Sequence, residues 1–264
     1  MAREVLLPPT VLCIGGHDPS GGAGLQADIE AVAACGGQAQ TLPTCLTAQN
    51  RHNAMGIQPV DPAFFQAMLD CLQQDNMSPA GIKFGLLASE EIIDILGSWL
   101  NTLPPGLPVV LDPVLRATGG ANLSNHRSAE ALMKQLLPLA TVVTPNQSEL
   151  RALTGLDDIE AAAEKLLAAG ANHVLVTGGD ANEAQVTNRL YGKTGRQLWQ
   201  WTRLPYNCHG SGCTLASALA TFLAHGEPMA RACEVAQHYT QQTLQQAVGA
   251  DDGPRLPRRI LPVT

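Results

Sequence analysis

The sequence predicts an α/β fold built on an open, mostly parallel central sheet with helices on both faces. Apolar runs of strand length alternate with longer segments of helical period along most of the 264 residues. Most of these runs are nearly all apolar, which is typical of parallel strands that helices cover on both sides. A closed eight-stranded barrel also gives this alternation, but the hairpin and the pair of helices near the end of the chain do not fit one.

The expected elements follow one another as strand and helix up to residue 177. Short apolar runs predict the strands Thr10–Gly15, Gln38–Leu46, Gly81–Leu86, Pro108–Pro113, Thr141–Thr144 and His173–Thr177. Helical periodicity predicts the helices Ala23–Ala34, Pro62–Gln74, Ser89–Asn101, Asn125–Leu137 and Asp157–Ala169. Asp157 and Asp158 suit the N-terminal cap of the last helix, and Gly170 stands where a C-cap glycine is expected.

The alternation changes after residue 177. The remaining elements expected are a hairpin, Asn188–Tyr191 and Gln197–Leu204 around Gly192–Gly195, and two helices, Gly210–Ala224 and Glu227–Val248. The sequence shows no internal repeat and no linker, so we expect a single domain over residues 1–264 with an extended tail from about Gly253. We expect the arginines of this tail to be solvated.

Charge and cysteine content argue against several classes of protein. Sixteen Lys and Arg against 23 Asp and Glu give a formal net charge of −7, whereas nucleic-acid and anionic-membrane partners need a basic surface. No apolar stretch approaches the roughly 18 residues of a membrane span, and the N-terminal apolar run lacks the cleavage site of a signal peptide. The seven cysteines are scattered without a CxxC pair, so we expect a reduced, cytoplasmic protein.

Five glycines in ten residues follow the first predicted strand, in Gly15–Gly24. Glycine lets the backbone approach a ligand closely and adopt positive φ, and open α/β sheets bind ligands at the carboxyl ends of their strands. The spacing is not the GxGxxG fingerprint of dinucleotide-binding folds. The alternative is a glycine-rich turn that only packs a helix on the sheet.

A second glycine-rich segment, His209–Thr214, opens an alanine-rich helix. Amide groups left free at a helix start, with the positive end of the helix dipole behind them, bind phosphate and stabilise charge during phosphoryl transfer. Cys213 lies in the first turn, where the dipole lowers the pKa of a thiol and suits it to act as a base. A buried structural cysteine beside a packing glycine pair is the alternative, and spacing alone does not decide.

Oxygen ligands follow the later strands at the same edge. Asn146 and Glu149 can present oxygens to one hydrated Mg²⁺ or close a capping box, and both roles can hold together. Asp112 ends the fourth strand and adds a carboxylate. Val176–Asp180 ends the sixth strand with a turn that suits a nucleotide. The histidines other than His209 show no metal-ligand spacing, and we assign them no role.

Together these segments resemble the hydroxymethylpyrimidine/phosphomethylpyrimidine kinases of thiamin biosynthesis, a branch of the ribokinase-like family that also contains pyridoxal kinases. The resemblance runs from about residue 11 to residue 248. It is most specific in six segments that occur in the order of the family: Gly16–Asp28, Gln49-Asn50, Lys83-Phe84-Gly85, Asp112-Pro113-Val114, Thr144-Pro145-Asn146 and His209–Thr214.

The resemblance implies a role for residues on the acceptor side of the site. Gly16, Asp28 and Gln49 would line the pyrimidine pocket, with Gln49 hydrogen-bonded to the edge of the aminopyrimidine. Cys213 would be the catalytic base. The anion hole would be formed by the amides of Gly210, Ser211, Gly212 and Cys213.

The resemblance also implies a nucleotide side. Asn146 and Glu149 would help to hold Mg²⁺, directly or through water, and Asp112 would lie near the phosphates of ATP. The residues expected to approach the nucleotide are Asn146, Thr177, Gly178 and Gly179.

The implied activity is ATP-dependent phosphorylation of 4-amino-5-hydroxymethyl-2-methylpyrimidine and of its monophosphate, by a homodimer. A pyridoxal/pyridoxine kinase and a non-catalytic pyrimidine-binding regulatory protein are the alternatives. The sequence departs from the family pattern at Arg51, Leu86, Thr118 and Thr177. Lysine is common at the last two positions, near the expected phosphates, so these departures bear on the phosphorylation of the monophosphate.

Overall fold

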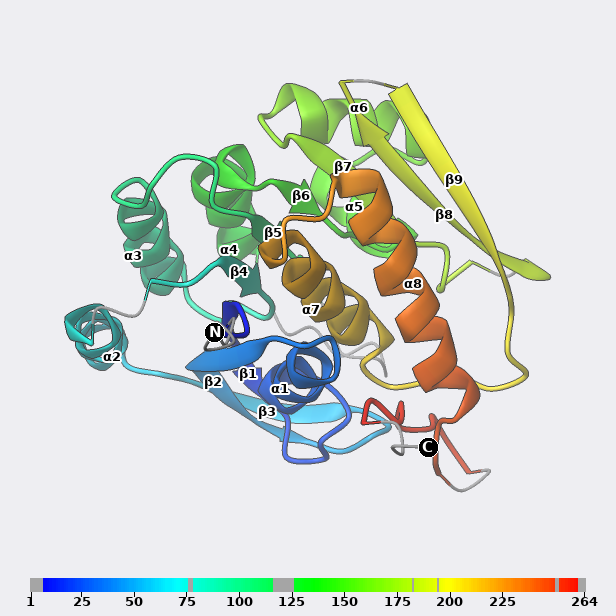
Figure 1. Cartoon of the computed structure of the whole chain (residues 1–264), viewed down its shortest axis with the longest axis horizontal. Coiled ribbons are helices and arrows are strands. Elements are labelled where there is room, and N and C mark those ends of the chain that lie inside the picture. The colour runs from blue at the N-terminus through cyan, green and yellow to red at the C-terminus, as the bar shows by residue number, and fades with distance from the viewer. Residues whose placement is uncertain are drawn as a thin grey trace, which may run out of the picture.

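A nine-stranded sheet runs through the protein in the order β3-β2-β1-β4-β5-β6-β7-β8-β9 (Figure 1). The structure is a computed structural model that describes residues 7–75, 78–115, 126–181, 183–193, 195–249 and 252–260. Six strands pair in parallel, whereas β3, β8 and β9 pair antiparallel with their neighbours. The predicted open, mostly parallel sheet is therefore confirmed, with antiparallel strands at both edges.

The bounds of the predicted strands agree with the predicted runs to within a few residues; in the hairpin, β8 is longer than predicted and β9 begins and ends two residues earlier. The strands are β1 (Thr10–His17), β2 (Gln38–Gln49), β3 (Ala54–Pro59), β4 (Gly81–Phe84), β5 (Val109–Leu111), β6 (Val142–Val143), β7 (His173–Val176), β8 (Gln185–Gly192) and β9 (Gly195–Thr202).

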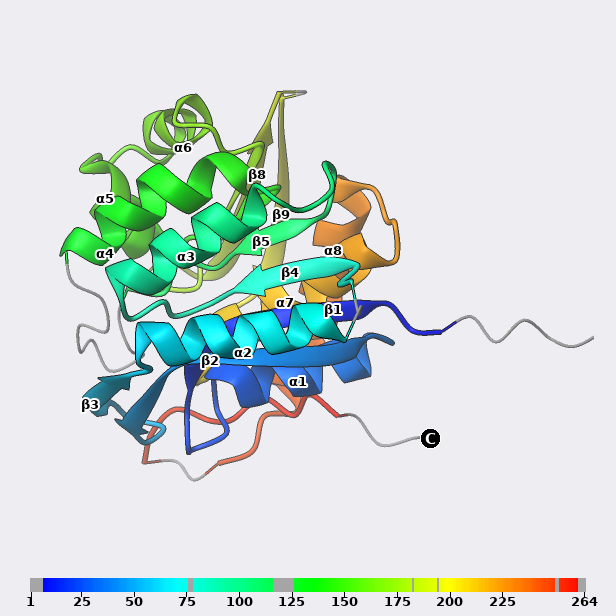
Figure 2. The ribbon, with the colours of Figure 1, turned by 90° about the vertical axis from the view of Figure 1, so that its left-hand side faces the viewer.

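Helices cover both faces of the sheet (Figure 2). One face carries α1 (Gly24–Ala34), α7 (Ser211–Ala224) and α8 (Met229–Gln245), and the other carries α2 (Pro62–Gln74), α3 (Glu90–Leu100), α4 (His126–Ala131), α5 (Gln147–Thr154) and α6 (Ile159–Ala168). In the described part of the chain, no helix has the length and apolar character needed to cross a membrane.

Each face of the sheet has its own apolar core. Leu12 and Ile14 of β1 pack with Phe65 of α2, whereas Val11 belongs to the cluster that contains Leu219 of α7. Successive side chains of a strand point to opposite faces of a sheet. A strand between two helical layers therefore needs apolar residues at consecutive positions, which is the pattern that predicted this arrangement.

Short polar side chains begin several helices. Asp61, Ser89 and Asp158 each accept a hydrogen bond from the backbone N–H three residues further on, which satisfies an amide that the helix leaves free. Asp158 is thus confirmed as the cap of the predicted helix. Gly170 follows the end of that helix with a φ of 114°, the left-handed conformation expected there.

Three elements differ from prediction. β3 was not expected, because Gly56 and Pro59 are unfavourable in strands, but an edge strand tolerates both. α5 follows β6 directly, where only a possible helix start was expected. The predicted helix Asn125–Leu137 begins outside the described residues and loses α geometry at Leu132, passing through a π turn and a 3₁₀ turn because Pro138 cannot continue an α-helix.

The prediction that the arginines of the tail are solvated is wrong for Arg259. Arg259 is only 2 % exposed. Arg255 also packs on the protein: its guanidinium carbon lies 4.1 Å from the centroid of the Tyr206 ring. Arg258 is exposed, as expected. The tail therefore packs against the fold.

The strand order places a ligand site at the carboxyl end of β1. The chain adds β2 on one side of β1 and later returns to add β4 on the other side. In open α/β sheets, the crevice at such a reversal of strand order is where ligands bind. Gln49, Asp112 and Thr177 follow or end strands at the same edge of the sheet.

Two neighbouring phenylalanines give a matched test of the α2 face. Phe65 is wholly buried, whereas Phe64 is 63 % exposed on the same helix. We expect Phe65→Ala to lower the free energy of unfolding by about 3–5 kcal/mol because it removes a large side chain from a packed core. Phe64→Ala should change it by less than about 0.5 kcal/mol. Urea unfolding followed by circular dichroism measures both, and equal losses would contradict the assignment of faces.

Candidate active site

The glycine loop (residues 18–23) follows β1 and is organised by Asp18. The buried carboxylate of Asp18 accepts hydrogen bonds from the backbone N–H groups of Ser20 and Ala23, both at 2.9 Å, and from the Ser20 hydroxyl at 3.0 Å. Gly24 then begins α1 with a φ of 58°, and a Cβ there would lie 2.3 Å from the carbonyl oxygen of Gly16. Glycine is required at position 24 for both reasons.

His209 joins the glycine loop to the end of β2. Its Nε2 lies 2.7 Å from Asp18 Oδ2 and 3.1 Å from Nε2 of Gln49. Burial opposes ionisation of Asp18, but hydrogen bonds from His209 and Ser20 outweigh it and lower the pKa of Asp18 to about 2. An ionised carboxylate at this distance requires a proton on His209 Nε2. That hydrogen is directed at Asp18, and the Gln49 amide lies beside the same ring nitrogen.

The start of α7 presents free amide groups beside the glycine loop. Thr214 donates the first helical hydrogen bond, to Gly210 O at 3.0 Å, so the N–H groups of Ser211, Gly212 and Cys213 have no partner within the helix. Gly210 has a φ of 84°, and a Cβ on it would lie 1.8 Å from the Gly22 carbonyl oxygen. A Cβ on Gly212 would meet nothing nearer than Asp112 Oδ1 at 4.0 Å. The first glycine is required by packing, and the second leaves space above the amides.

Buried charges lie beneath this turn. Lys83 of β4 and Asp28 of α1 have side chains that are 1 % and 0 % exposed, and Lys83 Nζ lies 2.8 Å from Asp28 Oδ1. The Ser217 hydroxyl of α7 donates to the same oxygen at 2.7 Å, and Asp112 Oδ2 lies 3.9 Å from Lys83 Nζ. Burial lowers the pKa of Lys83, but the nearby negative charges, Asp28 first, outweigh it and raise the pKa above its ordinary value. Lys83 therefore stays charged.

Burial dominates the titration of Cys213 and Asp112. It raises the pKa of Cys213 to about 12, with Lys83 opposing the shift and Asp112 adding to it. Burial also raises the pKa of Asp112 to about 6, against the pull of Lys83, and the Cys213 thiol donates a hydrogen bond to this carboxylate. The start of the helix is expected to lower the pKa of Cys213, but burial outweighs that effect. The Cys213 thiol is therefore protonated at neutral pH.

Asn146 and Glu149 form the capping box of α5. The Asn146 side chain accepts from Glu149 N–H at 2.8 Å, and the Glu149 carboxylate accepts from Asn146 N–H at 3.0 Å. Burial, and then the charge of Asp112, raise the pKa of Glu149 to about 8. Asp112 Oδ2 is buried and accepts no hydrogen bond within the described residues. Two carboxylates that disfavour each other's charge, one with an unused oxygen, fit a divalent cation.

The turn after β7 lies next to this capping box. Thr177 forms a parallel bridge with Asn146. Arg203 donates hydrogen bonds to the carbonyl oxygens of Gly178 at 3.1 Å and Gly179 at 3.0 Å. The Asp180 carboxylate accepts from the N–H of Ser148 at the start of α5. The segments predicted to face the nucleotide therefore form one continuous surface with Asn146.

The structure places most of the predicted residues at one edge of the sheet but encloses Asp28 among protein groups. Gly16, Gln49, Asp112 and the start of α7 surround the carboxyl ends of β1, β2 and β5, whereas Asp28 is closed off by Lys83 and Ser217. The part of Asp28 in a pyrimidine pocket stays a prediction. Sequence reasoning gave Lys83 no role, although a single lysine in an otherwise apolar strand is the signal that could have found it.

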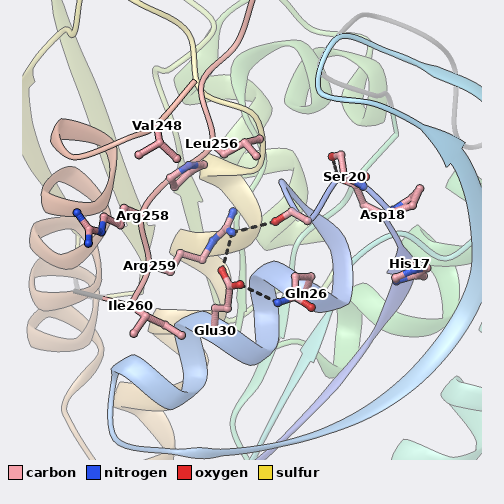
Figure 3. A pocket seen from close by; sticks show the side chains of 13 residues that line it. His17, Asp18, Ser20, Gln26, Glu30, Val248, Leu256, Arg258, Arg259 and Ile260 are labelled. Atoms are coloured by element: carbon pink, nitrogen blue, oxygen red, sulfur yellow. Dashed lines mark hydrogen bonds and ion pairs between the residues drawn. The ribbon is translucent and has the colours of Figure 1, made fainter. Parts of the chain in front are cut away.

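A separate cavity of about 490 Å³ lies between the glycine loop, α1 and the tail (Figure 3). Its lining includes His17, Gln26, Glu30 and Arg258, and it includes neither Gln49 nor any residue of α7.

Comparison with known proteins identifies related sequences over nearly the whole chain. The profile of a family described as phosphomethylpyrimidine kinase matches residues 18–256. A hydroxymethylpyrimidine/phosphomethylpyrimidine kinase of Haemophilus influenzae is 35 % identical over 92 % of this chain and 93 % of its own. A bifunctional thiamine biosynthesis protein of Geobacter sulfurreducens is 37 % identical over 93 % of this chain and 51 % of its own. The chain spans about a third to a half of the length of this and similar bifunctional or multifunctional relatives.

The fold matches solved structures as well. A pyridoxal kinase of Staphylococcus aureus in complex with pyridoxal superposes with a TM-score of 0.86 at 29 % identity, covering 96 % of this chain and 93 % of that one. This likeness confirms the predicted ribokinase-like arrangement.

Acid unfolding tests the Asp18 interactions. The pKa of Asp18 is lowered from 3.8 to about 2 on folding, so its stabilisation is complete above about pH 4 and is lost as the pH falls towards 2. We expect Asp18→Asn to lower the free energy of unfolding by roughly 2 kcal/mol at pH 7 and to flatten its decline between pH 4 and 2.5. Urea titrations across this range measure the slope. Asp75→Asn, an exposed control at the C-terminal cap of α2, should keep the wild-type slope. An unchanged slope for Asp18→Asn would rule out the interaction.

Proposed function

This chain belongs to the phosphomethylpyrimidine kinase family, and on that premise we infer that it phosphorylates 4-amino-5-hydroxymethyl-2-methylpyrimidine with ATP, and then the resulting monophosphate. The observation that carries this inference is the start of α7, where free amides and Cys213 meet Asp112 at the switch point of the sheet. Phosphoryl transfer needs mainly positioning and charge stabilisation at such a place.

The acceptor alcohol is proposed to lie over β1 and β2. Gly16 and Gln49 line its pocket, Asp28 contributes from its buried pair with Lys83, and the Gln49 amide beside His209 hydrogen-bonds the ring edge. The alcohol proton passes to Cys213 while the thiol proton passes to Asp112, whose pKa of about 6 allows it to accept one. The amides of Gly210, Ser211, Gly212 and Cys213 stabilise the charge on the transferred phosphoryl group.

The nucleotide side is proposed to use the strand ends of β5, β6 and β7. Asn146 and Glu149 would hold Mg²⁺, directly or through water, which would supply positive charge against the phosphate oxygens when bound, and Asp112 would lie near the phosphates of ATP. Thr177, Gly178 and Gly179 would approach the nucleotide.

Pyridoxal phosphorylation is the second candidate, because the fold superposes closely on a pyridoxal kinase. Pyridoxal, like the pyrimidine, is a flat heteroaromatic ring with a hydroxymethyl arm. We further propose a homodimer in the cytoplasm. The exposed Leu46 and Met55 on β2 and β3 support a protein partner at that edge, and light scattering after gel filtration tests the mass.

Side-by-side turnover with the three acceptors tests the assignment. The pyrimidine alcohol, its monophosphate and pyridoxal are each offered with ATP and Mg²⁺, and phosphorylated products are separated by chromatography. We expect the highest kcat/KM for the pyrimidine alcohol. A preference for pyridoxal would favour the second candidate, and binding of the pyrimidine without turnover of any acceptor would favour a regulatory protein.

Gly212 gives a test of the anion hole. The fold has room for a side chain at this position, but a valine would cover the amides of the first turn. We expect Gly212→Val to lower kcat on the order of a hundredfold, as the loss of an oxyanion-hole donor does, with Tm unchanged. Gly212→Ala introduces a smaller side chain and should lower kcat less than Gly212→Val does. Turnover of the valine variant within twofold of wild type would show that phosphate binds elsewhere.

Cys213 gives a test of the base. Serine is nearly isosteric with cysteine but far less acidic, so we expect Cys213→Ser to lower kcat by roughly 10²–10⁴. Tm and the KM of each substrate should barely move. If the serine variant keeps most of its kcat, the thiol fills space in the first turn of α7 and takes no proton.

A further inference from the structure

The tail (residues 252–260) crosses the segment that leads into α7. Leu256 and Val248 exchange backbone hydrogen bonds at 2.8 and 2.9 Å. Arg255 donates its N–H to Asn207 O at 2.8 Å and accepts from His209 N–H at 2.9 Å. The tail is therefore fixed by backbone bonds to the residues just before the proposed anion hole.

Arg259 is the buried side chain of this tail. It enters between the glycine loop and α1, as Figure 3 shows for its approach to Glu30. Its Nε donates to the Thr214 hydroxyl at 2.8 Å, and one terminal nitrogen lies 3.3 Å from Gly21 O and 3.1 Å from the Glu30 carboxylate. The other terminal nitrogen donates to the carbonyl oxygen of Gly22.

These contacts join the two segments between which phosphate is proposed to bind. Gly21 and Gly22 belong to the glycine loop, and Thr214 belongs to the first turn of α7, where its hydroxyl donates to Gly210 O at 2.8 Å. The Gly22 carbonyl that Arg259 binds is also the one against which Gly210 packs. The Gly22 carbonyl thus contacts the Arg259 guanidinium and packs against Gly210, and these two contacts fix the distance between the glycine loop and α7.

A guanidinium suits this position better than an ammonium. It is planar and carries five N–H donors in a fixed fork, whereas a lysine has one nitrogen on a flexible stem. One lysine nitrogen cannot meet Thr214, both loop carbonyls and Glu30 together. Glu30 neutralises the charge, so Arg259 acts on the loop and the helix and does not offer a free cation to a ligand.

The tail also contacts the turn between β2 and β3, which follows Gln49. Arg51 forms an ion pair with Asp252, and a Cβ on Gly253 would lie 2.1 Å from the ring of His52. The turn between β2 and β3 is thus packed against the same tail.

We propose that Arg259 is a positioning residue of the kinase reaction, which sets the glycine loop and the first turn of α7 at the spacing at which the α7 amides meet the transferred phosphoryl group. This inference rests on the proposed function. Displacement of catalytic groups by about 1 Å can lower the rate on the order of a hundredfold. Loss of Arg259 should therefore lower kcat.

Two substitutions of Arg259 test this role, with neighbours as controls. We expect Arg259→Lys and Arg259→Ala to lower kcat by roughly 10–100-fold while KM for ATP and for the pyrimidine changes less than about threefold. Arg258→Ala removes the adjacent exposed arginine, and Glu30→Gln removes the ion pair but keeps the contacts of Arg259 to loop and helix. Both controls should keep kcat within twofold of wild type.

Chemical rescue separates positioning from folding. Millimolar guanidinium chloride should restore much of the kcat of Arg259→Ala, and equal sodium chloride should not. If Arg259→Ala does not fold, the kcat of Arg259→Lys tests the proposal instead. A kcat of Arg259→Lys within twofold of wild type, or a loss that follows the folded fraction and ignores guanidinium, would overturn the proposal.

A binding measurement keeps this test independent of turnover. Inorganic phosphate should raise the Tm of the wild-type protein and raise that of Arg259→Lys less. If the wild type phosphorylates no acceptor but this difference is found, the proposed activity fails and the positioning role stands. Equal shifts for the two proteins would overturn the role itself.

Discussion

The buried ion pair between Lys83 and Asp28 is the interaction on which the site depends. It joins β4 to α1, and the Ser217 hydroxyl ties α7 to the same carboxylate oxygen. Removing one member of a buried pair leaves an uncompensated charge and costs roughly 3–5 kcal/mol, so the three elements are held in one relative position. The same ammonium opposes the pKa rise of Asp112 and Cys213. The buried pair therefore influences the protonation of both groups above it, although burial is the larger cause of their pKa shifts.

The two segments above this pair are held differently: the glycine loop uses both its amides and its carbonyls, whereas the first amides of α7 have no partner within the helix. His209 and the backbone of the glycine loop share the carboxylate of Asp18, and Gly21 and Gly22 present their carbonyl oxygens to Arg259. Gly210 can pack directly on this loop because it has no Cβ. A helix start fixed in this way keeps its first amides in place without a side-chain cap, which would otherwise occupy them.

Local features of the sequence were sufficient for most of the elements, though not for β3, and for several site residues. Strands buried on both faces need consecutive apolar residues, and the capping box of Asn146 and Glu149 joins residues only three apart. Contacts between distant residues could not be predicted: His209 and Asp18 lie 191 positions apart, and Arg259 and Gly21 lie 238 apart. The tail has the composition of a solvated basic segment. No local feature of its sequence indicates which of its arginines is buried in the fold. The pKa of Cys213 was equally inaccessible, since it is decided by burial rather than by its place in the helix.

The pairing of the basic side chains around the site limits how a phosphate can be held. Lys83 is bound to Asp28, Arg51 to Asp252 and Arg259 to Glu30, while Arg203 donates to the carbonyls of Gly178 and Gly179. Each of these cations among the described residues is already committed to a protein group. Asp112 and Glu149 lie at the same edge, and burial, the first cause, raises the pKa of both carboxyl groups. For the part of the chain that the structure describes, attraction for phosphate is therefore assigned to backbone amides and to positive charge that arrives with the nucleotide, which suits a loose phosphoryl-transfer transition state.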